Sequence, residues 1–513
     1  MQRRQLLKSL TALGAGSLLL KPSFASAFQS KHNSTSVINV KQLFNQALAQ
    51  DPALIGFTNI ENNFAPHKLK IEGKIPSGLS GHFYRNGPAK HERQALRYNH
   101  LFEGDGMVQE FAIHNGQIQH RGKFIETPKF VKEQTAKRFL YYGTDTKMPN
   151  SLPVSSADTI NTANTNVIAV GDDLWALWEA GSPSVLDTDE LSFVKHASLG
   201  ESSKYGKSLN GLPFSAHPKI DPNGDIWNFG LDPSGRVIVY HLNANGHAKN
   251  VNIINAQYFG GMLHDFLITE RHVLLILPSF ERANANHRKQ AGFFRNIRYN
   301  PSKSMRVIVV NKSDLSVKRE FELSPGFVFH FGNAWEERNG TIHFDASLYP
   351  NVDTLHALGN VMKGKRADMH SNAKTTLFTL YPSGKTAQSN LSINSEFPRV
   401  CDHVVGRQNQ RLYFLSGRDD AIWSDSVCAL NIGTGNVDKF EFGEDFLVEE
   451  HIPVCPQRKE NTGFLIGTAL HVPTKHTCLN IFAANNLADG PLARAWLPYY
   501  LPLGFHGNFK TTV

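Results

Sequence analysis

The chain has 513 residues, of which 41% are hydrophobic and 19% are charged. This balance predicts a globular protein with a large buried core and excludes a chain that is disordered throughout. The formal net charge is +8, but the basic residues are dispersed and no nucleic-acid motif accompanies them. We therefore expect no nucleic-acid partner. The charge favours contact with anionic lipid, and solubility alone would explain it equally well.

The first 27 residues have the features of an export signal. Arg3 and Arg4 precede a small and apolar run at residues 12–20, and the small-residue sequence ASA follows at residues 25–27. The apolar run is too short to span a bilayer. The pattern QRRQLLK resembles a twin-arginine signal, which exports folded proteins, and an ordinary secretory signal or an uncleaved anchor is the alternative. We expect export to the periplasm.

Two further parts of the chain follow the signal. Residues 28–50 begin with a polar stretch rich in Ser and Asn, which predicts a linker. From residue 51 to 513 the chain consists of short β-type segments separated by Gly-containing turns, as in DPNGDIWNFG, DPSGRVIVYHL, ERNGTIHFDASL, YPSGKTAQ and GTGNVDKFEF. Successive hairpins without a strong helical block predict a single all-β domain. A β-propeller is favoured because its radial closure protects the edges of the sheets.

Four histidines stand in separate segments, each at the start or end of a short strand. They are His217 in SAHPKIDPNGDIW, His264 in GGMLHDFLIT, His330 in FVFHFGNAWEE and His506 in PLGFHGNF. About fifty to nearly two hundred residues separate neighbours in this set, whereas zinc-finger ligands cluster a few residues apart. Inner strands of different propeller blades run along one axis, where four inward side chains can meet. An all-imidazole set favours a transition metal over calcium or magnesium.

Five further motifs occur in order along the chain. They are GHFYRNGP at 81–88, FEGDGMV at 102–108, NTANTNV at 161–167, LWALWEAG at 174–181 and EFPRV at 396–400. Together with the histidine segments they resemble the carotenoid cleavage oxygenase family. The resemblance implies a seven-bladed β-propeller with a cap of helices and loops over an axial metal site. It also implies one Fe²⁺ per chain and O₂-dependent cleavage of a C=C bond of a carotenoid or apocarotenoid into two carbonyl products.

Acidic residues are expected next to the histidines. A metal-bound imidazole usually donates its other ring N–H to a carboxylate or a carbonyl group. The family resemblance gives this role to Glu179 in ALWEAG and to Glu396 in EFPRV. A third carboxylate is expected in VEEHIPVCP, where the match to the family is offset by about one residue. Both Glu449 and Glu450 are candidates, and we favour Glu450.

The substrate implied by the resemblance is apolar. The 34 phenylalanines fit a tunnel for a rigid polyene, although Phe is also an ordinary core residue. Phe102, Phe331 and Phe505 adjoin motif residues, and we expect them to line the cavity. The segment HRKQAGFFRNIRY at 287–299 mixes basic and aromatic residues. It could dip into a membrane surface to collect substrate, and a solvated loop is the alternative.

A stilbene is the second candidate substrate. Members of the family that cleave stilbenes recognise a phenol with a lysine and a tyrosine. Lys129 in ETPKF stands approximately where that lysine is expected, and Tyr98 or Tyr84 could be its partner. A surface lysine is the bland alternative. A retinoid-type isomerohydrolase ranks third.

The four cysteines, Cys401, Cys428, Cys455 and Cys478, all lie in the last quarter of the chain. One or two disulfides are possible in an oxidising compartment, but so sparse a set favours buried thiols in strands. Two functions of other classes stay open. The protein could be a secreted binding propeller with a structural metal, or a zinc-dependent hydrolase that needs no oxygen.

Overall fold

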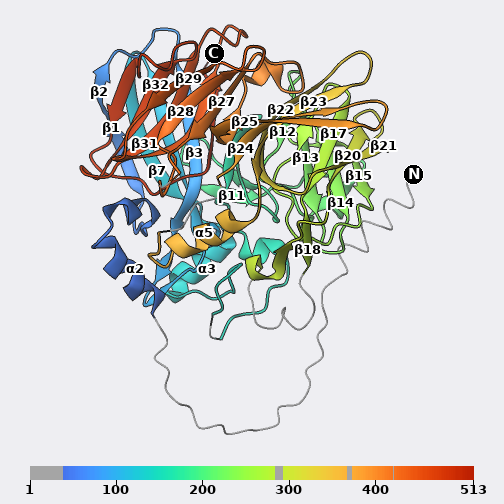
Figure 1. The fold of residues 1–513 in the computed structure, drawn as a ribbon. Coiled ribbons are helices and arrows are strands. Elements are labelled where there is room, and N and C mark those ends of the chain that lie inside the picture. The colour runs from blue at the N-terminus through green and yellow to red at the C-terminus, as the bar shows by residue number, and fades with distance from the viewer. Residues whose placement is uncertain (1–38, 149, 283–292, 367–371, 420, 513) are drawn as a thin grey trace, which may run out of the picture.

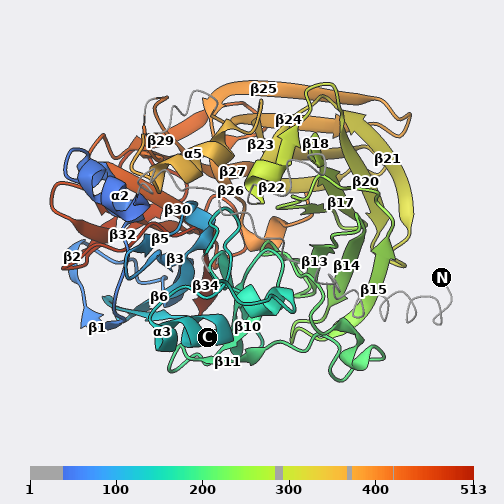
Figure 2. The ribbon, with the colours of Figure 1, turned by 90° about the horizontal axis from the view of Figure 1, so that it is seen from below.

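The computed structural model describes residues 39–512 except 149, 283–292, 367–371 and 420. The expected signal at 1–27 therefore lies outside the described residues. Seven antiparallel sheets of four or five strands succeed one another along the chain, and Figure 2 shows them arranged in a ring. The all-β, seven-bladed propeller is confirmed. No described helix combines the length and the hydropathy of a membrane span.

The middle five blades each consist of four strands that are nearly consecutive in sequence. Blade 2 comprises β8 (Asn166–Val170), β9 (Asp173–Leu177), β10 (Ser184–Leu186) and β11 (Phe193–His196). Blade 3 comprises β12 (Lys219–Ile220), β13 (Ile226–Leu231), β14 (Val237–Leu242) and β15 (Ala248–Ile254). Blade 4 comprises β16 (Leu267–Ile268), β17 (His272–Leu277), β20 (Met305–Asn311) and β21 (Val317–Leu323). Blade 5 comprises β22 (Phe327–Glu336), β23 (Ile342–Tyr349), β24 (Lys374–Leu380) and β25 (Thr386–Asn394). Blade 6 comprises β26 (Glu396–Arg399), β27 (Arg411–Ser416), β28 (Ser426–Asn431) and β29 (Val437–Glu441).

The two remaining blades close the ring with strands from opposite ends of the chain. Blade 1 has the order β1 (Phe64–Lys68), β7 (Gln117–Phe124), β6 (Asp105–His114), β3 (Gly81–Lys90) and β34 (His506–Thr511). Blade 7 has the order β2 (Lys70–Gly73), β33 (Ala493–Trp496), β32 (His476–Ala483), β31 (Phe464–His471) and β30 (Phe446–Val454). The C-terminal strand thus pairs with an early strand, and His506 stands opposite Asn86. These pairings tie the two ends of the chain together and close the ring.

The hydrophobic core lies between neighbouring blades. Strand β17, with the sequence HVLLIL, is buried at every position because both of its faces are covered. Its side chains and those of β20 pack against Phe331 and Phe344 of the next blade. Two-sided burial explains why the inner strands have continuous apolar runs rather than the alternation of a half-exposed sheet.

The helices gather on one side of the propeller, below the sheets in Figure 1. They are α2 (Val40–Leu48), α3 (Pro128–Ala136) and α5 (Asp353–Val361). Short 3-10 helices are Pro52–Phe57, Leu101–Glu103, Ala157–Ile160, Gly206–Leu209, Phe294–Asn296 and Asp402–Val404. Two short hairpins lie outside the blades: β4 (Glu92–Arg93) pairs with β5 (Leu96–Arg97), and β18 (Phe280–Arg282) pairs with β19 (Ile297–Tyr299). The expected cap of helices and loops is therefore present.

Helix α2 corrects the predicted boundary of the folded domain. We assigned residues 28–50 to a linker, but α2 occupies most of their second half. The Asn39 side chain caps the helix by accepting the backbone N–H of Lys41. Phe44 is 1% exposed, and the guanidinium of Arg97 lies 3.5 Å from its ring centroid. This single apolar anchor, preceded by a polar stretch, is a weak signal in the sequence.

The cysteines behave in two different ways. Cys401, just before the 3-10 turn Asp402–Val404, forms a disulfide with Cys455 at the end of β30, with their Cα atoms 6.0 Å apart. Cys428 and Cys478 are buried free thiols. The expectation of buried thiols is therefore wrong for the first pair and right for the second. Blades 6 and 7 are neighbours, which brings together two cysteines that are 54 positions apart.

Candidate metal centre

The four histidines meet on the propeller axis. His217 and His264 lie in the loops that lead into β12 and β16, His330 lies within β22, and His506 begins β34. All four are buried, and their ligand nitrogens lie within 4.8 Å of one another. They come from blades 3, 4, 5 and 1, and the inner strands of the remaining blades adjoin them. Among the described residues, no other group of histidine, cysteine and acidic side chains converges in this way.

The nitrogen positions fit one transition-metal ion. The Nε2 atoms of His217 and His506 are 3.0 Å apart, and those of His264 and His330 are 3.2 Å apart. Two nitrogen ligands about 2.1 Å from one ion, at a right angle to each other, lie about 3.0 Å apart. The Nδ1–H groups of His330 and His506 donate to carboxylates, and in the neutral tautomer this leaves the Nε2 lone pair of each ring free for a metal. Converging lone pairs are suited to a cation.

Two of the predicted carboxylates each support one histidine from a neighbouring blade. Glu396, at the start of β26 in blade 6, accepts the Nδ1–H of His330. Glu450, in β30 of blade 7, accepts the Nδ1–H of His506 at 3.0 Å. The structure thus places Glu450, the favoured candidate, against the histidine. Glu449 instead accepts hydrogen bonds from Arg85 and Thr468.

Glu179 serves two histidines less directly. It follows β9 of blade 2, and its Oε1 lies 3.1 Å from Nδ1 of His264 and 3.8 Å from Nδ1 of His217. Neither Nδ1 has an aligned hydrogen-bond acceptor within the described part of the chain. These contacts are therefore electrostatic rather than directional. The Glu179 side chain is also 31% exposed, compared with 4% for Glu450.

Burial and charge act differently on three of the four imidazoles. Burial lowers the pKa of His217 well below its ordinary value and that of His506 to about 4, so both are neutral at pH 7. Burial opposes the charged form of His264 too, but the Glu179 carboxylate outweighs it and raises the pKa. Burial would raise the pKa of Glu450, but Arg399 and His506 hold it at about 2. Neutral imidazoles beside an ionised carboxylate are the forms that ligate metal.

A large apolar cavity opens onto the histidines from the cap side. Its volume is about 890 Å³, and its wall includes His264, His330 and His506. Ligand pockets commonly have volumes of roughly 300–1,000 Å³, so this one is large enough for an extended molecule. Most of the wall is apolar, and its buried aromatic side chains include Phe294, Phe329, Tyr349 and Phe505.

The three predicted phenylalanines divide between the cavity and the core. Phe102 and Phe505 line the cavity, with ring centroids 5.4 Å apart. Phe331 does not, because its ring packs between blades against Phe344. The pairing of β22 with β23 shifts register on both sides of Phe331, which breaks the usual alternation of side chains. Phe329 and His330 both reach the cavity as a result, so the assignment of Phe331 to the cavity is wrong.

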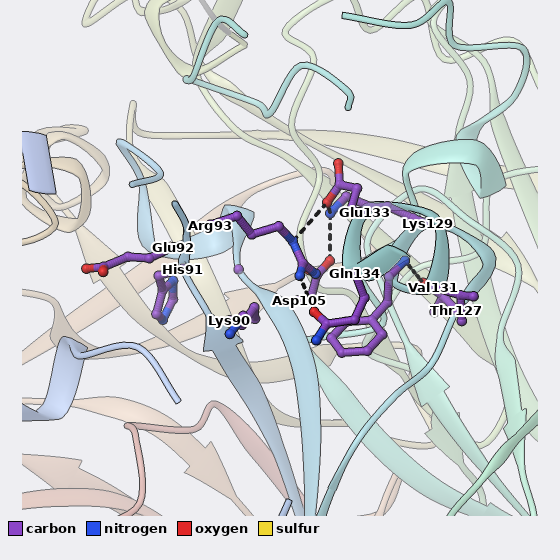
Figure 3. A network of polar contacts seen from close by, with 12 residues as sticks. Lys90, His91, Glu92, Arg93, Asp105, Thr127, Lys129, Val131, Glu133 and Gln134 are labelled. Carbon is purple, nitrogen blue, oxygen red and sulfur yellow. Dashed lines mark hydrogen bonds and ion pairs between the residues drawn. The ribbon is translucent and has the colours of Figure 1, made fainter. Parts of the chain in front are cut away.

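Lys129 lies in a buried ionic network, as Figure 3 shows. Its ammonium is 2.6 Å from Asp105, 2.9 Å from Glu133 and 3.2 Å from the hydroxyl of Tyr98. Arg93 joins the network at 2.9 Å from Asp105. Lys129, Tyr98 and the other tyrosine considered, Tyr84, are all buried and are not among the described residues that line the cavity. The structure therefore does not place Lys129 where a phenol in the cavity would meet it.

Sequence reasoning missed several residues of the centre. The Tyr349 hydroxyl donates to Glu396 at 2.7 Å. Phe397 has a φ of +52°, a conformation that bulky residues rarely adopt, and its ring stacks on His330 with centroids 4.9 Å apart. Arg399 holds Glu450. Phe397 and Arg399 stand within the EFPRV motif, so the motif was a signal for them, whereas nothing in its surroundings distinguishes Tyr349.

Fold and site together define a β-propeller with an axial four-histidine metal centre. The sequence profile of the retinal pigment epithelial membrane protein family matches residues 57–511. The apocarotenoid-15,15'-oxygenase of Synechocystis sp. is 27% identical over 465 residues, which cover 86% of this chain and 92% of that protein. The lignostilbene-α,β-dioxygenase isozyme III of Sphingomonas paucimobilis is 27% identical over 470 residues, which cover 86% and 93%.

Solved structures agree with the sequence comparison. The crystal structure of a chimera of apocarotenoid oxygenase and RPE65 superposes with a TM-score of 0.80 at 25% identity, and covers 90% of this chain and 99% of that one. The chain belongs to the retinal pigment epithelial membrane protein family, which is the carotenoid oxygenase family that its motifs resemble.

Proposed function

We propose that this protein is an Fe²⁺-dependent dioxygenase that cleaves a C=C bond of a carotenoid or apocarotenoid to give two carbonyl products. The observation that carries the proposal is the apolar cavity of about 890 Å³ that opens directly onto three of the four histidines. A purely structural metal would be enclosed by its ligands. A cavity that reaches the ligands supports catalysis on an apolar molecule instead.

One set of residues would bind the metal, and another would bind and orient the substrate. His217, His264, His330 and His506 would hold one Fe²⁺, which would activate dioxygen. Because the ligands are neutral imidazoles, the ion would keep its full charge. The aromatic walls built from Phe102, Phe329 and Phe505 bind a flat polyene, orient one double bond over the centre and exclude water.

A stilbene ranks second for a specific reason. The lysine and tyrosine that would receive its phenol are Lys129 and Tyr98, and both are committed to the buried network of Asp105 and Glu133. Extracting the ammonium would leave Asp105 and Glu133 to share the single cation of Arg93, at a cost approaching the roughly 3–5 kcal/mol of an unpaired buried charge. The similarity to a lignostilbene dioxygenase keeps this substrate class in the test.

The test is product analysis by mass spectrometry. The Fe²⁺-loaded protein is incubated under ¹⁸O₂ with carotenoids, apocarotenals and hydroxystilbenes in separate reactions. We expect ¹⁸O-labelled aldehydes from the polyenes and slower or no cleavage of the stilbenes. The His217→Ala variant should be inactive, and the matched variant His343→Ala should be active, because His343 pairs with Glu337 away from the centre. Turnover without oxygen, or no product from any polyene, would contradict the proposal.

We also propose that the protein works in the periplasm and touches a membrane to collect its substrate. The rim of the cavity exposes large apolar side chains: Tyr142 and Phe259 are each 51% exposed, Val154 is 45% exposed and Phe293 is 41% exposed. Phe293 belongs to the segment 287–299, whose first six residues lie outside the described ones. An apolar rim that continues into an apolar cavity gives a lipid-soluble substrate a dry path.

Two measurements test this location. Wild-type protein should co-sediment with anionic vesicles, and the double variant Phe259→Ser/Phe293→Ser should do so at least several-fold less. Equal binding of the two proteins to the vesicles would contradict a role for the rim in membrane contact. Cell fractionation should find the full-length chain in the periplasm, whereas Arg3→Lys/Arg4→Lys should retain it in the cytoplasm. Export of that variant at the wild-type level would contradict the twin-arginine signal.

A further inference from the structure

Arg399 stands behind one of the four histidines, on the far side of its carboxylate. The Arg399 Nε donates to Oε1 of Glu450 at 2.8 Å, and Nη2 donates to Oε2 at 3.2 Å. The same Nη2 donates to the carbonyl oxygen of Gly507 at 2.7 Å. The guanidinium therefore clamps both oxygens of the carboxylate and is itself fixed to the residue that follows His506.

The clamp closes a small ring of hydrogen bonds. Glu450 accepts the Nδ1–H of His506 through Oε1 at 3.0 Å and the backbone N–H of Gly507 through Oε2 at 2.8 Å. Each carboxylate oxygen thus has two donors, and each donor fixes the plane of the carboxylate. With that plane fixed, the imidazole of His506 has a single favourable orientation.

The other two carboxylates of the centre lack such a clamp. Glu396 is held by the Tyr349 hydroxyl and the backbone N–H of Phe397, both of which are neutral donors. Among the described residues, Glu450 is the only one of the three carboxylates that pairs with an arginine or a lysine. Glu450 is therefore the carboxylate through which a cation, Arg399, can control a histidine ligand, His506.

We propose that Arg399 is a positioning residue of the metal centre: by fixing Glu450 it aims His506, and it thereby sets the affinity for the metal. Arg399 contacts neither a ligand nitrogen nor the described wall of the cavity, so it acts through Glu450 and through the carbonyl group of Gly507. Removing a partner of a ligand commonly costs 10–100-fold in metal affinity. The inference rests on the metal centre of the proposed function, but not on the identity of the substrate.

The test compares Arg399→Ala with Arg399→Lys and with a matched control. Arg271 clamps Glu336, which in turn accepts the Nδ1–H of His272 at 2.7 Å, so the same Arg–Glu–His arrangement occurs between blades 4 and 5, away from the centre. Arg271→Ala removes that guanidinium and should leave metal binding unchanged. Metal affinity is measured by competition with a chelator, and ligand geometry by the visible spectrum of the Co²⁺-loaded protein.

We expect Arg399→Ala to bind Co²⁺ and Fe²⁺ at least about tenfold more weakly and to change the Co²⁺ spectrum. Arg399→Lys should recover part of the affinity, because an ammonium restores the charge but cannot bond both oxygens in the same fork. If Arg399→Ala does not fold, Arg399→Lys alone decides: a wild-type affinity and spectrum would overturn the proposal. Neither readout needs turnover, so a failure of the proposed cleavage reaction would be seen separately.

Discussion

The Cys401–Cys455 disulfide offers a quantitative test of how blades 6 and 7 are held together. It joins the segment just after β26, which carries Glu396, to the end of β30, which carries Glu450. The two cysteines are 54 positions apart. Closing a loop of that length lowers the entropy of the unfolded chain enough to stabilise the folded state by about 4 kcal/mol at 25 °C. The double variant Cys401→Ser/Cys455→Ser should lose about that much free energy of unfolding.

The assay is a guanidinium titration of wild type and variant, followed by tryptophan fluorescence, with and without a phosphine reductant. The reductant should lower the stability of the wild type to that of the variant. It should leave the variant unchanged, because Cys428 and Cys478 are already free thiols. If wild type and variant unfold at the same denaturant concentration under oxidising conditions, the disulfide does not stabilise the folded state as reasoned.

Three further predictions concern the metal, acid and the buried network. His217→Ala should retain less than about a tenth of the wild-type iron after a chelator challenge, measured by elemental analysis; full retention would remove it from the ligand set. Burial lowers the pKa of His100 to about 3 and that of His451 to about 4, so the unfolded chain binds more protons below pH 6.5. Each histidine therefore loses about 3 kcal/mol of stabilisation as the pH falls from about 6.5 to 4. Thermal melts that are flat across that window would contradict this. Lys129→Met leaves Asp105 and Glu133 to share the single cation of Arg93 and should cost up to about 3–5 kcal/mol with unchanged iron content. An unshifted melt would show that the network carries no such energy.

The fold and the histidine set could be predicted because each has a strong local signal. Turn residues between apolar runs mark hairpins wherever they occur, and many hairpins in succession leave few architectures that close their sheet edges. His217, His264, His330 and His506 each stand in a distinctive motif. That they meet on one axis follows from the propeller itself.

Sequence reasoning was ambiguous or wrong where a strand departs from regular alternation. Glu449 and Glu450 are both buried because β30 shifts register between Val448 and His451, so neighbouring residues both point inward. Phe331 was assigned to the cavity although the same kind of irregularity in β22 gives that place to Phe329. An irregularity of this kind depends on the partner strand, which a single sequence does not show.

Contacts between residues far apart in the chain could not be predicted from the sequence either. Lys129 reads as a surface lysine or a phenol ligand, and only the fold brings Asp105 to its ammonium. The disulfide between Cys401 and Cys455 depends on the neighbouring positions of two blades in the same way. Charge and reactivity are visible in a sequence, but the partner that satisfies them is a property of the tertiary structure.

Each of the seven blades contributes one residue to the metal centre, either a histidine ligand or a carboxylate that supports a ligand. Blades 1, 3, 4 and 5 each provide one histidine, and blades 2, 6 and 7 each provide one carboxylate. The cavity wall, in contrast, includes many loop residues on the cap side, such as Phe259 and Phe293. Changes in those loops can reshape the cavity without moving the ligands. The choice of substrate can therefore vary within this architecture while the reaction at the axis stays the same.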